Sequence, residues 1–269
     1  MLTQIISLAS QKGGTGKSTS TLNLGYSLAS LGNHVLLIDG DPQGGLSLGT
    51  NIGEKEKPGL ADILTGKAKP EECIVNSRNL TLSALGSGHF STDSLIKSET
   101  QAGKHILMDA VISVSQGFNY VLIDCPAGMG SFVRAFLSVS NSVIIPLNMR
   151  NTAVRSLPVF LQFIEDVRHK YNPSLTVEGI LVTMLDFASR SEIEIFKTAK
   201  DTLPSTTIFK TVINHDYIFE DLSLNGAAAA MSRKATKAAR GYFELALELH
   251  ERKINRVKGD EDEEFQGLF

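Results

Sequence analysis

The most informative stretch of the chain lies near its start and reads Gln11-Lys12-Gly13-Gly14-Thr15-Gly16-Lys17-Ser18-Thr19. An apolar run, Gln4–Ala9, leads directly into it, and an amphipathic stretch, Ser18–Leu31, follows it. Counted from Gly13, the segment is two residues shorter than the common GxxxxGKS/T phosphate loop, but counted from Gln11 it has the usual length and contains Lys12. A strand, a glycine-rich loop and a helix in this order predict a loop that wraps an anion.

The residues of this loop have the chemistry that a bound nucleotide requires. Glycines let the backbone approach the phosphates closely, and the N–H groups at the start of a helix point toward them. Lys17 supplies a mobile positive charge to the β- and γ-phosphates, and the Ser18 hydroxyl can bind Mg²⁺. We expect nucleotide contacts from Lys12, Gly13, Gly14, Thr15, Gly16, Lys17, Ser18 and Thr19.

Short apolar runs alternate with amphipathic stretches along the whole chain. The predicted strands are Gln4–Ala9, Val35–Asp39, Leu80–Leu85, Tyr120–Asp124, Ser142–Pro146, Val177–Leu185 and Thr207–Val212. The predicted helices are Ser18–Leu31, His105–Ser115, Ser131–Val139, Ser156–Tyr171, Ser191–Leu203 and Ala235–Arg256. Uninterrupted apolar runs such as Val35–Ile38 indicate strands buried on both faces, as in a parallel sheet. The pattern predicts a doubly wound α/β fold, with a mostly parallel sheet and helices on both faces.

Two segments depart from this alternation. Gly44–Gly103 is rich in Gly, Ser and Thr, which predicts loops with one short helix at Gly59–Leu64. The end of the chain carries the acidic run Gly259–Glu264, which predicts a disordered tail over residues 259–269. We see no linker or internal repeat before this tail, and we therefore expect a single domain over residues 1–258.

Two of the predicted strands end in an aspartate, Asp39 in one case and Asp124 in the other. Ligands of open α/β sheets bind at the carboxyl edge, where both side chains would lie beside the phosphate loop. A single aspartate at a strand end is as often a turn or helix cap. Together with the phosphate loop, and in this order, the residues Ser18, Asp39 and Asp124 predict a Mg²⁺ site, in which Asp124 also contributes to nucleotide binding.

Composition and charge exclude several other classes of protein. The chain has 269 residues, of which 42% are hydrophobic and 20% charged, as is typical of a soluble globular protein. Its formal net charge of −3 argues against coating nucleic acid by bulk charge. The chain has two cysteines, Cys73 and Cys125, which lie far apart in sequence with no CxxC pair and no His cluster nearby. This excludes a disulfide scaffold or zinc module and fits a reducing compartment. The start shows no signal-peptide pattern and no apolar run approaches ~18 residues, so we expect a cytoplasmic protein without an integral membrane segment.

Lys12 makes the phosphate loop unusual, because it adds a second lysine ahead of Lys17. With it the loop resembles the KGGxGKS/T signature of the ParA/MinD family of deviant Walker ATPases. The segment Val35-Leu36-Leu37-Ile38-Asp39-Gly40-Asp41-Pro42-Gln43 resembles that family's DxDPQ motif. Residues Tyr120-Val121-Leu122-Ile123-Asp124-Cys125-Pro126-Ala127-Gly128 resemble its Walker B strand and switch II, and Ala239–Leu249 its closing helix. The likeness covers roughly residues 1–250 and favours ParA-type partition ATPases, of the Soj-like kind without an N-terminal helix-turn-helix extension.

The resemblance implies an activity and a role for each residue of the site. It implies hydrolysis of ATP to ADP and phosphate, slow in the isolated protein and stimulated by a partner, with Mg²⁺ as the second cofactor. Asp41 would help to place the attacking water, and Lys12 would reach the phosphates of the other protomer in an ATP-bound sandwich dimer. Positioning and positive charge supply most of the barrier reduction in phosphoryl transfer. Lys12, Lys17 and Asp41 are therefore the predicted catalytic residues.

The resemblance also implies partners. The ATP-bound homodimer would bind DNA without sequence preference and so associate with the nucleoid, and a ParB-like or other cargo-linked protein would stimulate hydrolysis. The alternative is a MinD-like or flagellar-number-type regulator of division-site or cell-pole placement, which acts at the membrane through a C-terminal amphipathic helix. Here the end, Glu263–Phe269, has apolar residues but no cationic face, and its acidic run would repel anionic lipid. Whether the cargo is a plasmid, a chromosome or another assembly stays open.

The predicted DNA contacts are basic residues before and within the closing helix, together with one residue from a separate loop: Arg233, Lys234, Lys237, Arg240 and Arg190. Spacings of three and four place Arg233, Lys237 and Arg240 along one helical face. A solvated helix surface is the alternative interpretation. The segment Ile213–Glu220 departs from the family pattern, because it is acidic and aromatic where basic residues are expected.

Overall fold

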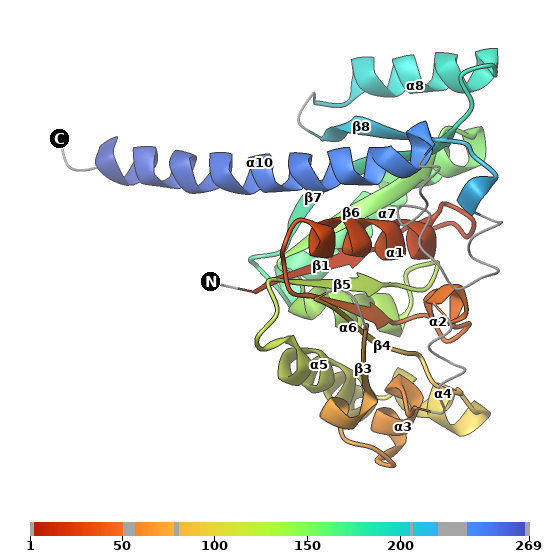
Figure 1. Ribbon diagram of the computed structural model, residues 1–269, viewed down its shortest axis with the longest axis vertical. Helices are drawn as coiled ribbons and strands as arrows, with labels where there is room; N and C mark the ends of the chain where they lie inside the picture. The colour runs from red at the N-terminus through yellow and green to blue at the C-terminus, as the bar shows by residue number, and fades with distance from the viewer. Residues whose placement is uncertain (1–2, 51–56, 78–80, 205–206, 220–235, 267–269) are drawn as a thin grey trace.

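The computed structural model describes residues 3–50, 57–77, 81–204, 207–219 and 236–266, which form one sheet with helices against both faces (Figure 1). The strand order is β3-β4-β2-β5-β1-β6-β7-β8. The strands are β1 Gln4–Leu8, β2 Val35–Asp39, β3 Ile74–Asn76, β4 Leu82–Leu85, β5 Tyr120–Asp124, β6 Ser142–Asn148, β7 Thr176–Leu185 and β8 Ile208–Asn214. All neighbouring pairs are parallel except β3 and β4, which confirms the predicted doubly wound, mostly parallel sheet.

The helices divide between the two faces of the sheet. They are α1 Lys17–Ser30, α2 Gly45–Thr50, α3 Leu60–Thr65, a 3₁₀ turn Pro70–Cys73, α4 Thr92–Glu99, α5 Gln101–Ser115, α6 Ser131–Val139, α7 Asn151–Lys170, α8 Arg190–Thr202 and α10 Lys237–Gln266. Leu28 of α1 and Tyr242 of α10 belong to one buried cluster, and Phe136 of α6 and Phe160 of α7 belong to the other. The sheet is thus covered by α1 and α10 on one side and by α5, α6 and α7 on the other.

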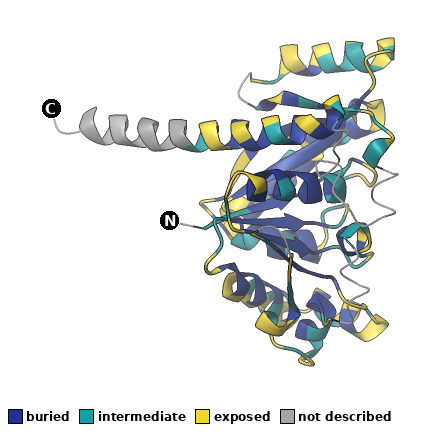
Figure 2. Ribbon diagram, viewed as in Figure 1, coloured by how far each residue is buried: buried dark blue, intermediate teal, exposed yellow. Residues whose placement is uncertain are grey.

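The strands β2, β5 and β6 are buried along their whole length, and β1 between β5 and β6 is buried over its last three residues (Figure 2). In β2, Leu36 and Ile38 face the cluster that contains α6 and α7, whereas Val35 and Leu37 face the cluster that contains α1 and α10. Side chains of a strand alternate between its two faces, so a strand covered on both sides needs an apolar residue at every position. This explains why the uninterrupted apolar runs predicted these strands correctly.

The segment 44–103 is more regular than its composition predicts. The predicted helix at Gly59–Leu64 corresponds to α3 and the predicted strand at Leu80–Leu85 to β4. The segment also contains α2, the 3₁₀ turn, β3, α4 and the start of α5. Two of these helices begin at hydroxyl caps: Ser91 accepts a hydrogen bond from the N–H of Ser94, and Thr100 from the N–H of Gly103. Ser and Thr are frequent in loops and equally favoured as helix caps, so the composition alone does not separate the two.

The long C-terminal helix differs from its prediction in length. α10 continues to Gln266 and projects beyond the sheet in Figure 1, so residues 259–266, for which the acidic composition predicts disorder, are helical. The sequence after Glu251 contains Glu, Lys and Arg, which are good helix formers, and no proline, and the helix continues through Gly259, the residue of this stretch that disfavours a helix most. Residues 267–269 lie outside the described part of the chain.

A partly buried ion pair, Arg252 with Glu248, fastens α10 to β8, one of the two edge strands of the sheet. The Glu248 carboxylate accepts hydrogen bonds from the backbone N–H groups of Lys210, at 2.8 Å, and Thr211, at 3.0 Å. Arg252 donates to Glu248 at 3.0 Å and to the carbonyl oxygen of Glu178 at 2.7 Å, which lies in β7. Burial opposes ionisation of Glu248, but the two backbone donors and Arg252 outweigh it and hold its pKa below the ordinary value.

Candidate functional site

The glycine-rich loop joins β1 to α1 at the carboxyl edge of the sheet. Gly14 and Gly16 adopt positive φ angles of 68° and 80°, a region that favours glycine. Gly16 is the N-cap of α1, and no side chain caps this end or places an acidic group in its first turn. A Cβ at Gly13 or Gly14 would meet nothing within 4 Å, so the loop is open on that side. The N-terminus of α1 is thus free to bind an anion through backbone N–H groups.

The two lysines of the loop occupy different environments. Lys17 is 7% exposed and lies beside Asp124, whose pKa its positive charge lowers in part. Lys12, five residues earlier, is exposed to solvent. Its backbone is nevertheless anchored, because the Ser10 hydroxyl donates to the Lys12 carbonyl oxygen at 3.0 Å. One lysine is therefore buried within the site and the other is exposed to solvent.

The two strand-end aspartates lie on adjacent strands. Asp39 and Asp124 are register partners in the β2–β5 pair, and they are 1% and 0% exposed. Burial, and then the negative charge of Asp39, raise the pKa of Asp124 to about 8. Neither carboxylate oxygen of Asp124 has a hydrogen-bond partner among the described residues, although the Ser18 hydroxyl is near enough to lower this pKa somewhat. A buried carboxylate in this state needs a cation or a proton.

Asp39 and Asp41 already have partners within the protein. Asp39 accepts hydrogen bonds from the N–H of Ser47, at 2.7 Å, from the Ser47 hydroxyl, at 2.6 Å, and from the N–H of Asp41, at 3.2 Å. Burial raises the pKa of Asp39 to about 6, although these hydrogen bonds oppose the shift. Asp41 accepts from the N–H of Gln43 at 2.9 Å. Asp39 therefore holds α2 against the sheet, and α2 in turn lies next to the loop, because a Cβ at Gly45 would be 3.0 Å from the Ser18 hydroxyl.

These features fit a nucleotide with Mg²⁺. Mg²⁺ in phosphate sites takes few ligands from the protein, and the buried Asp124 with the Ser18 hydroxyl provides a suitable pair. The open side of the loop beside Gly13 and Gly14 leaves room for the phosphates. Within the described ranges there is no cluster of three or more His, Cys, Asp or Glu side chains that could hold a metal by itself.

Two polar side chains that the sequence motifs do not include also reach the loop. Asn148, the last residue of β6, donates to the carbonyl oxygen of Gly14 at 3.3 Å. Thr183 of β7 donates to the carbonyl oxygen of Thr15 at 2.9 Å. The signal that could have found them is the one used for the aspartates, namely a polar residue near the carboxyl end of an apolar strand.

The structure places only some of the predicted DNA contacts. Lys237 and Arg240 are exposed on the first turn of α10, and Arg190 begins α8. The Lys237 ammonium lies 5.8 Å from the ring centroid of Phe187, so the start of α10 is close to the loop before α8. Arg190 forms an exposed ion pair with Glu194 at 3.1 Å. Arg233 and Lys234 lie outside the described residues.

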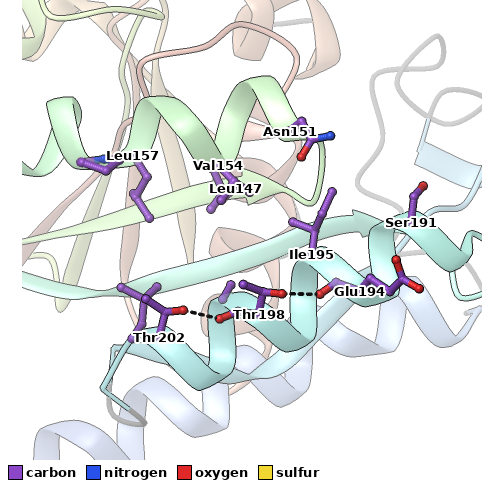
Figure 3. A pocket seen from close by; sticks show the side chains of 12 residues that line it. Leu147, Asn151, Val154, Leu157, Ser191, Glu194, Ile195, Thr198 and Thr202 are labelled. Carbon is purple, nitrogen blue, oxygen red and sulfur yellow. Dashed lines mark hydrogen bonds between the residues drawn. The ribbon is translucent and has the colours of Figure 1, made fainter.

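A separate groove of about 550 Å³ lies between α7 and α8, over the end of β6 (Figure 3). Its walls are mainly apolar, with Leu147, Leu157 and Ile195 among the residues that line it. The hydroxyls of Thr198 and Thr202 bond to backbone carbonyls one turn earlier in α8, at 3.0 and 2.7 Å. The helices of the described part of the chain include none long and apolar enough to cross a membrane.

Together, the fold and the loop between β1 and α1 define a P-loop nucleotide-binding protein of the deviant Walker type. Residues 3–177 match the family model AAA_31, described as an AAA domain. The chain is 29% identical over 248 residues to the sporulation initiation inhibitor protein Soj of Bacillus subtilis, covering 91% of this chain and 98% of that protein. It is 28% identical over 257 residues to the chromosome partitioning protein ParA of Caulobacter vibrioides, covering 94% and 96%.

A comparison with solved structures also finds P-loop ATPases of this kind. The septum site-determining protein MinD of Pyrococcus horikoshii, complexed with Mg-ADP, superposes with a TM-score of 0.75 at 26% identity, covering 91% of this chain and 95% of that one. The chain belongs to the ParA/MinD family of P-loop ATPases.

Proposed function

We propose that this protein is a ParA-type ATPase that binds ATP and Mg²⁺ and dimerises when ATP is bound. In this proposal the dimer binds DNA without sequence preference, and a cargo-linked protein stimulates ATP hydrolysis. The observation that carries the proposal is the contrast within one loop between the buried Lys17 and the exposed Lys12. An exposed lysine beside the phosphate loop is accessible to the phosphates bound by a second protomer.

Each residue of the site has a part in the proposed reaction. Lys17 and the backbone N–H groups at the start of α1 bind the phosphates, and Asp124 and Ser18 hold the metal. Bound Mg²⁺ would neutralise charge on the β- and γ-phosphate oxygens. Asp41 lies after β2, beside the same edge, and orients the attacking water. Lys12 of the second protomer completes the positive charge around the γ-phosphate, so hydrolysis depends on dimerisation.

Sedimentation velocity with and without ATP and Mg²⁺ tests the proposal. The native protein is expected to be a dimer with ATP and a monomer with ADP, whereas Lys12→Ala should bind ATP and stay monomeric. Lys67→Ala, which removes another exposed lysine far from the loop, is the matched control and should dimerise normally. If Lys12→Ala dimerises and hydrolyses ATP like the native protein, Lys12 has no role across the interface.

Binding assays on the ATP-bound form test the DNA part of the proposal. An ATP-dependent shift of random-sequence DNA that weakens steeply with salt supports it. If the ATP-bound protein pellets with anionic vesicles and does not shift DNA, this result contradicts the DNA part of the proposal and favours the MinD-like alternative.

A further inference from the structure

Two register partners in the sheet hold two consecutive carbonyl groups of the phosphate loop. Asn148 of β6 and Thr183 of β7 stand opposite each other in the parallel β6–β7 ladder, at the carboxyl edge. Their side chains reach the carbonyl oxygens of Gly14 and Thr15, which are 134 and 168 residues away in sequence. Asn148 is 8% exposed and Thr183 is 1% exposed.

The orientation of these carbonyls also sets the orientation of the loop N–H groups. In a planar trans peptide the C=O and the following N–H point in opposite directions. A Gly14 carbonyl held toward β6 therefore turns the Thr15 N–H away from β6. In the same way, a Thr15 carbonyl held toward β7 turns the Gly16 N–H, at the N-cap of α1, away from β7. Both donors then face the open side of the loop, where phosphate would bind.

Two neighbouring features support this arrangement. Met184, directly after Thr183, has a positive φ of 52°, which non-glycine residues rarely adopt. A strained backbone at a site indicates that the surrounding structure holds it there. The methyl end of Thr183 also packs over the loop, since a Cβ at Gly16 would lie 3.8 Å from it. β7 therefore contacts the loop through packing as well as through the hydroxyl.

We propose that Asn148 and Thr183 are positioning residues of the phosphate loop, which hold the Gly14 and Thr15 carbonyls so that the Thr15 and Gly16 N–H groups point at the β-phosphate. The proposal rests on the nucleotide site described above. It assigns to β6 and β7 a role in phosphate binding, in addition to the contribution of β1, β2 and β5.

Calorimetric titration with ADP and Mg²⁺, together with thermal melts without nucleotide, tests this proposal. Thr183→Val keeps the volume and removes the hydroxyl, whereas Thr183→Ser keeps the hydroxyl. Asn148→Leu keeps the approximate volume and removes the amide donor, together with an Oδ1 atom that is buried without a partner among the described residues. Thr198→Val makes the same change as Thr183→Val in α8, where the hydroxyl bonds only within its helix.

We expect Thr183→Val and Asn148→Leu each to bind ADP about 5–10-fold more weakly, the loss expected for one hydrogen bond. Thr183→Ser and Thr198→Val should bind ADP within about 2-fold of the native protein. Asn148→Leu should melt no lower than the native protein, because it removes an unsatisfied buried oxygen. If Asn148 served only the stability of the fold, a variant with an unchanged melting temperature would also keep its affinity for ADP.

Native affinity in both Thr183→Val and Asn148→Leu would overturn the proposal. A loss of affinity that Thr183→Ser shares equally would also overturn it, because the hydroxyl would then not be the cause. A native protein that does not bind ADP at all would instead contradict the proposed function, so the two failures are distinguishable.

Discussion

The carboxyl edge of β1, β2 and β5 and the groove between α7 and α8 are both open, but their polar groups differ. At the edge, Asp124 is fully buried without a hydrogen-bond partner among the described residues, and the start of α1 has no side-chain cap. In the groove, Thr198 and Thr202 are satisfied within their own helix, and most of the wall is apolar. The groove has the volume of a ligand site, whereas the edge has the unpaired groups that a ligand would satisfy. Unpaired buried polar groups are the better guide to a site, because a fold keeps them only at a cost in stability.

The largest expected effect is on ATP affinity, which should depend on the carboxyl edge of the sheet and not on the groove between α7 and α8. Lys17→Ala should weaken ATP binding by about 100-fold or more, because it removes a buried, charge-assisted contact to the phosphates. Ile195→Ala, which enlarges the groove, should leave ATP affinity unchanged. Calorimetric titration of both variants measures this. Undiminished ATP affinity in Lys17→Ala, or an equal loss in both variants, would remove the distinction between the regions.

The next effect concerns catalysis at the edge. Asp41→Ala should still bind ATP and should hydrolyse it about 10–100-fold more slowly, a loss of ~1.4–2.7 kcal/mol of transition-state stabilisation. The variant should accumulate as an ATP-bound dimer. Phosphate release and sedimentation are the measurements. A variant of Asp41 that is monomeric and free of ATP would instead assign this residue to folding or to metal capture.

A smaller effect is expected at the surface shared by α10 and the loop before α8. Reversing the charge of Lys237 and Arg240 to Glu should weaken ATP-dependent binding to random DNA by about 10-fold or more and lower the slope of its salt dependence. ATP hydrolysis without partners should be unchanged. A gel-shift series at several salt concentrations measures this. The matched control is Lys67→Glu with Lys69→Glu, two exposed lysines elsewhere, and equal losses in both pairs would indicate a general charge effect.

A further effect concerns stability and its dependence on pH. Because burial raises the pKa of Asp124 to about 8, the folded protein keeps a proton that the unfolded chain loses near pH 4. Between about pH 4 and pH 8 the folded state therefore binds more protons than the unfolded state, so the free energy of unfolding falls as pH rises. Asp124→Asn should flatten this dependence in the nucleotide-free protein and raise stability at pH 8 by about 1–3 kcal/mol. Denaturant melts at pH 5 and pH 8 measure it; a steeper dependence in the variant would contradict it.

The sequence predicted the parts of this molecule that depend on local pattern. The runs Val35–Asp39 and Tyr120–Asp124 are apolar at almost every position because helices cover both faces, and the loop at Lys12 is a contiguous motif. Within 44–103 the helix α3 was predicted, whereas α4 and the first turn of α5 were missed, because hydroxyl caps such as Ser91 and Thr100 resemble loop residues. Asn148 and Thr183 were missed for another reason. Each is a polar residue near the carboxyl end of an apolar strand, but its contact with the loop depends on the position of β6 and β7 in the sheet, which no segment of sequence gives by itself.

The contact between Glu248 and β8 has a consequence for solubility. A strand at the edge of a sheet offers backbone N–H groups on which another chain can add as a new strand, and such edges are starting points for aggregation. Glu248 occupies the N–H groups of Lys210 and Thr211, and Arg252 occupies the carbonyl oxygen of Ile208 at 3.3 Å. Two side chains of one helix thereby occupy three backbone groups of this strand. The backbone groups that Glu248 and Arg252 hold are therefore not available for unproductive pairing with another copy of the chain.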